Sequence, residues 1–158
     1  MKKPDFKKIR VIQLLSQNRK PEAPLWLLAV MEQELSKPCR LTLQKKSRGT
    51  TTGTAWSFTR LEMDFDHELG ARIHLSIAPD EDSRWTLFVA LHEIAHINVG
   101  THNEHNEIWL KEAMRLYRKY DLINWLAEVM QEPASIYRSY RTEEKAIIKA
   151  SSRKAKRS

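Results

Sequence analysis

The segment from Arg84 to Val99 constrains the fold of this chain more than any other. Apolar residues lie before, within and after one polar cluster, His92-Glu93-Ile94-Ala95-His96, in a pattern typical of a single helix. The acidic turn before it, from Asp80 to Ser83, favours a helix start, with Ser83 as the expected N-cap. Gly100 suits the helix end, because glycine tolerates a left-handed backbone. Two histidines and a glutamate on a partly buried helix are costly, so something must compensate them.

The spacing within the cluster suits one metal ion. Positions i and i+4 of a helix lie one turn apart on the same face, so His92 and His96 can bind the same ion. Glu93 follows the first histidine directly, so its carboxylate lies beside the ion and can take a proton from a zinc-bound water. The residues alone therefore predict metal-assisted hydrolysis. The alternative is a pair of histidines that only pack or form hydrogen bonds.

The third metal ligand is expected after the Gly100 turn, because a catalytic zinc has three protein ligands and an open fourth position. Two histidines follow that turn, His102 and His105. His102 lies six residues after His96, as the third ligand does in metzincins, but their glycine would lie one residue earlier than Gly100. His105 directly precedes the next expected helix. The spacing alone leaves both histidines open.

Together these segments resemble the SprT-like metallopeptidases, especially the small members found in phages and mobile elements. That family has a His-Glu-x-x-His helix, a short turn, and a histidine followed four residues later by Trp or Phe. Here His105 corresponds to the third ligand and Trp109 to the aromatic residue packed behind it. Leu69 to Ser76 also looks like the family's strand before the active helix. The resemblance covers roughly residues 56–120, and the family's Cys-rich zinc ribbon has no counterpart, because Cys39 is the only cysteine.

The resemblance implies a zinc-dependent peptidase. Zn²⁺ would be bound by His92, His96 and His105, and Glu93 would be the catalytic base. The implied core is zincin-like, with a protein or peptide substrate bound as an extra strand along the edge of the sheet. The implied reaction is hydrolysis of peptide bonds, in some members within proteins bound to DNA.

The remaining pattern predicts an α+β domain, with a small, mainly antiparallel sheet packed on the active-site helix and helices flanking it. Three segments alternate in hydrophobicity as strands do, namely 40–44, 55–59 and 71–77. Helical patterns cover 9–15, 25–37, 84–99, 106–120, 122–131 and 135–150. Residues 151–158 have nothing apolar to bury, which predicts a disordered tail.

The charge is concentrated at the two ends of the chain. Residues 1–20 and 137–158 each carry a net charge of +6, whereas residues 21–136 carry −5. This predicts a basic N-terminal segment (1–20), a metallopeptidase domain (21–136), and a basic C-terminal helix and tail (137–158). Such ends either contact the phosphates of DNA or are only solvated. The first case leads to an alternative function, a nucleic-acid-binding module with a structural, non-catalytic zinc site.

Other features predict a cytoplasmic protein. No apolar run is long enough to cross a bilayer, and the first residues lack the apolar stretch of a secretory signal. A single cysteine cannot form an internal disulfide, which suits a reducing compartment. The natural substrate and the oligomeric state do not follow from the sequence.

Overall fold

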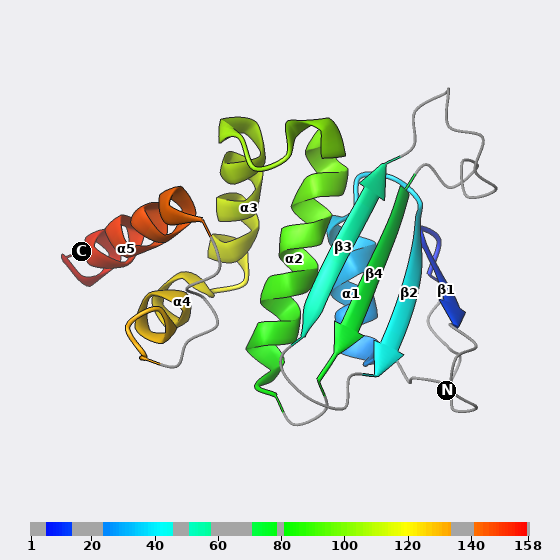
Figure 1. The fold of residues 1–158 in the computed structure, drawn as a ribbon, viewed down its shortest axis with the longest axis horizontal. Coiled ribbons are helices and arrows are strands. Elements are labelled where there is room, and N and C mark those ends of the chain that lie inside the picture. Colours follow the sequence, from blue (N-terminus) through cyan, green and yellow to red (C-terminus); the bar gives the residue numbers. More distant parts are fainter. Residues whose placement is uncertain are drawn as a thin grey trace.

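The structure is a computed structural model that describes residues 6–13, 24–45, 51–57, 71–78, 81–133 and 141–157. It confirms an α+β fold, in which the sheet lies at one side of the molecule and the C-terminal helices at the other (Figure 1). The elements in chain order are β1 (Ile9–Gln13), α1 (Leu25–Glu34), β2 (Cys39–Lys45), β3 (Thr52–Ser57), β4 (Ala71–Ile77), α2 (Ser83–Val99), the 3₁₀ turn η2 (Thr101–Asn103), α3 (Glu107–Lys119), α4 (Ile123–Val129) and α5 (Thr142–Arg157).

The sheet is mixed, in the order β1-β2-β4-β3. β2 pairs in parallel with both β1 and β4, and only β3 runs antiparallel to its neighbour, β4. The prediction of a mainly antiparallel sheet was therefore wrong. Alternating hydrophobicity is the same in parallel and antiparallel strands, so it carries no information on direction. Here α1 provides the crossover that parallel pairing of β1 and β2 requires, and β3 pairs on the outer edge of β4.

β1 corrects a second prediction, because the helix expected over residues 9–15 is a strand from Ile9 to Gln13. Ile9 pairs with Cys39 and Gln13 with Leu43 on β2. A short run with several β-branched residues is compatible with either periodicity, and pairing with β2 decides between them. Residues 14 and 15 of the expected helix lie outside the described residues.

α2 is the central element of the molecule. It lies between the sheet and α3 (Figure 1), and it contacts α1, β3, β4 and α3. This position explains its apolar composition, since a helix covered on several sides is apolar all round. Three of its residues, Phe88, Leu91 and Ile94, are fully buried in the core.

The ends of α2 follow simple rules. Asp82, rather than the predicted Ser83, is the N-cap, and its side chain accepts a hydrogen bond from the backbone N–H of Arg84 at 2.9 Å. Asp and Ser cap helices about equally well, so the choice between neighbouring residues depends on the backbone. At the other end Gly100 has a φ of 91°, as expected of a glycine that ends a helix.

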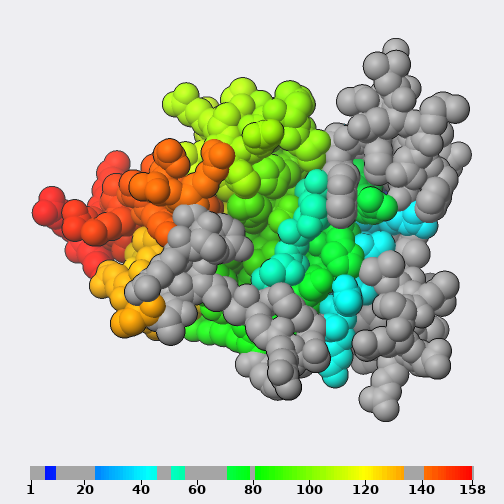
Figure 2. All heavy atoms as spheres, viewed as in Figure 1, coloured from blue at the N-terminus to red at the C-terminus, as the bar shows by residue number. Residues whose placement is uncertain are grey.

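The C-terminal part is more ordered than its composition predicts. α5 continues to Arg157, whereas residues 151–158 were expected to be disordered. Ser152 is buried, and the Arg118 side chain donates a hydrogen bond to the hydroxyl of Ser151 at 3.2 Å. α5 forms one end of the space-filling surface (Figure 2). Within the described segments, none of the helices combines the length and the apolar character needed to cross a bilayer.

Candidate metal centre

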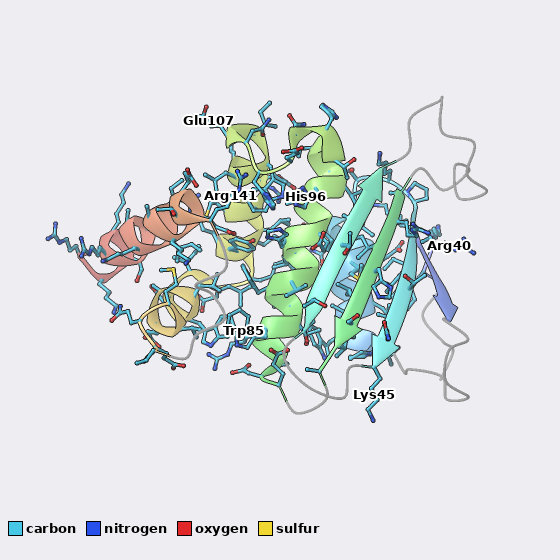
Figure 3. The ribbon with its side chains drawn as sticks, viewed as in Figure 1. Arg40, Lys45, Trp85, His96, Glu107 and Arg141 are labelled. Carbon is cyan, nitrogen blue, oxygen red and sulfur yellow. The ribbon has the colours of Figure 1, made fainter. Side chains whose placement is uncertain are left out.

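α2 presents His92 and His96 on the side that faces α3. Their ring centroids lie 5.1 Å apart, as expected for side chains one helical turn apart. In Figure 3, His96 lies between the two helices, toward the opposite end of α2 from Trp85. His92 is buried and His96 is partly buried.

The turn after α2 brings a third histidine to the same place. Asn103 donates a hydrogen bond from its side chain to the Val99 carbonyl at 2.6 Å, and Asn106 donates one to the side chain of Asn103 at 3.0 Å. Asn106 also caps α3 by accepting from the N–H groups of Ile108 and Trp109, both at 3.1 Å. Within this turn Glu104 has a φ of 46°, which side-chain-bearing residues rarely adopt. The turn therefore places His105 firmly opposite α2.

The Nε2 atoms of the three histidines converge. The Nε2 atom of His105 lies 3.1 Å from that of His92 and 3.2 Å from that of His96. Two nitrogens bound to one tetrahedral ion at 2.0–2.1 Å would lie about 3.3 Å apart, close to both values. Simple hydrogen bonding explains the convergence less well, because one Nε2–H can be directed at only one of two acceptors. The donor set and its spacing thus fit a metal ion held by His92, His96 and His105.

The electrostatics keep these rings in the form that binds metals. Burial, followed by the charges of His96 and His105, holds the pKa of His92 well below its usual value. Burial and the charge of His105 lower the pKa of His96 to about 4. The pKa of His105 is also lowered, mainly by burial and then by the charge of Arg141. All three imidazoles are therefore neutral near pH 7, as metal ligation requires.

Trp109 packs against all three rings. Its ring centroid lies 4.6 Å from those of His92 and His105, and it stacks on His96 at 5.1 Å with an interplanar angle of 27°. The indole is almost completely buried on α3. Trp109 therefore fixes the orientation of the three imidazole rings, and a side chain of another shape at this position would change that orientation.

His102 lies outside the cluster, although the spacing left it open as a ligand. Its side chain is exposed and lies over Gly100, where an added Cβ would come within 2.6 Å of the imidazole. The amide nitrogen of Asn103 lies 3.3 Å from its Nε2 atom. The structure instead places His105, the histidine favoured by the family resemblance, next to His92 and His96.

Glu93 is buried beside the β3 strand. Only 6% of its surface is exposed, and burial raises the pKa of its carboxyl to about 8. β3 approaches it at Gly53, where an added Cβ would lie 2.8 Å from the Glu93 Cγ atom. Residue 53 lies outside the segments whose alternation predicted strands, so nothing in the pattern indicated this contact.

Arg141 is the other residue that the sequence did not indicate. Its Nη1 atom donates a hydrogen bond to the backbone carbonyl of His105 at 3.2 Å, and Figure 3 places it near His96. It precedes α5 and is 36 residues away from His105 in the chain. A contact of this kind has no local sequence signal.

Comparisons with protein-family models, curated proteins and solved structures found no match to this chain.

Proposed function

We propose that this protein is a zinc-dependent metallopeptidase of the SprT-like type, with His92, His96 and His105 as metal ligands and Glu93 as the catalytic base. The observation that carries the proposal is the convergence of three neutral imidazole Nε2 atoms next to a buried glutamate of the same helix. Trp109 supports the family resemblance, because it packs on all three rings, as the aromatic residue of that pattern would.

The chemistry follows from the side chains. His92, His96 and His105 would hold a zinc ion, which would supply Lewis acidity to polarise a carbonyl and to lower the pKa of water. Glu93, as a carboxylate, accepts the proton of the attacking water and then returns it to the leaving amine. The burial of Glu93 suits this exchange of a proton, because it raises the pKa of the carboxyl from 4.5 to about 8, which is closer to neutral pH. A neighbouring divalent cation would favour the carboxylate form that starts the reaction.

The position of β3 supports a peptide substrate. It is the end strand of the sheet, and it packs against α2, which carries Glu93. An extended peptide can pair with an edge strand through backbone hydrogen bonds, with affinity that depends little on its sequence. A protein segment bound in this way would lie close to the metal centre. Proteins associated with DNA are substrates that the basic ends of the chain would favour.

Zinc content tests the metal centre. Purified wild-type protein is expected to hold about one zinc ion per chain. His105→Ala should lose it, whereas the matched control His102→Ala should keep it, because His102 lies outside the cluster. Loss of zinc only in His102→Ala would show that His102, and not His105, is the third ligand. Absence of zinc from the wild type after reconstitution would remove the basis of the proposal.

Peptide cleavage tests the role of Glu93. Glu93→Gln keeps the shape of the side chain but cannot take a proton, so it should retain zinc and lose activity by at least about 100-fold. Glu107→Gln, an exposed change at the start of α3, should behave as the wild type. Full cleavage by Glu93→Gln would contradict the proposed mechanism.

A second candidate function is nucleic-acid binding with a structural zinc. The observation that favours it is the exposed side of α5, which carries Lys149, Arg153, Lys156 and Arg157. On this hypothesis DNA affinity would fall steeply with salt, and no protein would be cleaved. Replacing Arg153, Lys156 and Arg157 by Gln should then weaken DNA binding and reduce its salt dependence. Unchanged affinity would exclude α5 as the binding surface.

A further inference from the structure

Gly53 on β3 occupies a place where no other residue fits. An ideal Cβ built at this position would lie 2.8 Å from Glu93 Cγ, 2.9 Å from Val89 Cγ1 and 3.0 Å from Glu93 Oε1. Real Cβ atoms essentially never come within 3.0 Å of a heavy atom that is distant in the chain, so any side chain at position 53 would force Glu93, Val89 or the strand to move.

The glycine is needed for space rather than for backbone freedom. Among the described glycines only Gly100 has a positive φ, so the backbone of Gly53 is one that any residue can adopt. Gly53 pairs with Leu75 of β4 in regular antiparallel register. A β-branched residue would favour this strand conformation more than glycine does. The local structure therefore gives no reason for a glycine, and the contact with α2 does.

The contact involves the two side chains of α2 that face β3 at this level. Val89 and Glu93 are four residues apart and so lie one above the other on the same face of the helix. The backbone of β3 enters the notch between them, and both side chains are buried there. The neighbouring strand residues Thr52 and Thr54 are exposed, so they do not share this role.

We propose that Gly53 is a positioning residue for Glu93. With no side chain of its own, it lets the strand backbone form the wall against which the Glu93 side chain rests, and so determines where the carboxylate lies relative to the three histidines. The catalytic part of this inference rests on the proposed peptidase function, whereas the packing part does not.

Activity and metal content test the catalytic part. In zinc-loaded Gly53→Ala, kcat for a peptide substrate should fall about 10- to 100-fold with KM within about threefold, because small misplacements of a reacting group have effects of this size. Zinc should remain at about one per chain, since no ligand is touched. Gln44→Ala, an exposed change on β2 that lies away from the proposed substrate edge, is the control and should keep wild-type kcat. More than a third of wild-type kcat in Gly53→Ala would overturn the proposal.

A stability cycle in the metal-free protein tests the packing part without any activity. Gly53→Ala should lower the thermal midpoint by roughly 3–10 °C, as overpacking does in a chain of this size. Glu93→Ala removes two of the three close contacts of the new methyl group and leaves the one with Val89, so in that background the shift should be clearly smaller. If the two changes are additive, Gly53 does not position Glu93, and the proposal fails.

The two tests separate the possible failures. A wild type that cleaves no peptide but shows strong coupling in the cycle would contradict the proposed function and keep Gly53 as the residue that places Glu93. If Gly53→Ala does not fold, the same comparisons are made in a Val89→Ala background, where the 2.9 Å contact is absent. Wild-type activity and additive stability there would overturn the inference.

Discussion

Glu144 is another buried carboxyl of the molecule, with no part in the reaction we propose. It lies on α5 and accepts a hydrogen bond from the hydroxyl of Tyr117 at 2.8 Å. Burial raises the pKa of Glu144 to about 7, although the Tyr117 bond and the charge of Lys145 act in the opposite direction. At neutral pH this carboxyl is therefore partly protonated inside the protein, which makes the docking of α5 sensitive to pH.

The sign of this effect can be tested. The pKa of Glu144 is raised from 4.5 in the unfolded chain to about 7 in the folded one, so the folded state binds the proton more tightly. The resulting stabilisation is complete below about pH 4.5 and is lost as the pH rises through 7. The wild type should lose this stabilisation between pH 5 and pH 8, and Glu144→Gln should not. The unfolding free energy of Glu144→Gln relative to that of the wild type should therefore rise by roughly 2–3 kcal/mol over this range.

Urea unfolding of the metal-free proteins at both pH values measures this change. Glu143→Gln is the control, because its side chain is exposed, and this variant should behave as the wild type. Equal pH dependence in Glu144→Gln and the wild type would show that Glu144 titrates normally.

At the scale of elements, the short connection from α2 to α3 places the third histidine of the candidate metal centre. Asn106 caps α3 directly after His105, by accepting hydrogen bonds from two N–H groups. The loss of such a cap typically lowers stability by about 1 kcal/mol. Because the cap adjoins the third histidine, its loss should also loosen the ligand.

We therefore expect Asn106→Ala to lose about 1 kcal/mol of stability and to bind zinc several-fold more weakly. Chemical denaturation and competition with a chromogenic chelator measure the two effects. Asn124→Ala, an exposed change on α4, should alter neither. Zinc affinity at the wild-type level in Asn106→Ala would mean that the rest of the turn suffices to hold His105.

The last turns of α5 are the other element-scale test. Deleting residues 151–158 removes the buried Ser152 and the hydrogen bond between Arg118 and Ser151. We expect a loss on the order of 1–2 kcal/mol, measured by thermal unfolding. Replacing the exposed Arg153, Lys156 and Arg157 by Gln should change stability by less than about 0.5 kcal/mol. A deletion without effect would restore the expectation of a disordered tail.

At the scale of the whole molecule, the candidate metal centre lies where α2 and α3 pack on each other. Two of the proposed ligands lie on α2 and the third lies after the turn, and Trp109 of α3 packs against all three rings. An ion that binds only the folded chain stabilises it by about 4 kcal/mol when its free concentration is a thousand times its Kd. Metal binding should therefore raise the free energy of unfolding of the whole domain.

We expect a strong chelator to lower the thermal midpoint of the zinc-loaded wild type by several degrees. The same treatment should leave His105→Ala unchanged, because that variant holds no metal to remove. His102→Ala should respond as the wild type does. A wild-type midpoint that ignores both zinc and chelator would argue against a metal bound by the native protein.

Local spacing was enough to predict the helix that carries His92, Glu93 and His96, and also the positions of β2, β4 and α3. These features depend on residues within one or two turns or along one strand, where periodicity follows directly from backbone geometry. The choice of His105 over His102 needed the family resemblance in addition, because two nearby histidines satisfied the spacing.

Only the tertiary structure decided the direction of the strands, the identity of β1 and the contacts of Gly53 and Arg141. Each of these depends on groups that are far apart in the chain. β1 is a strand because β2 is available to pair with it, and Gly53 matters because α2 lies against β3. The arrangement of His92, Glu93 and His96 thus follows from local helical geometry. The surroundings of these residues follow from long-range packing, which leaves no periodic signal in a single sequence.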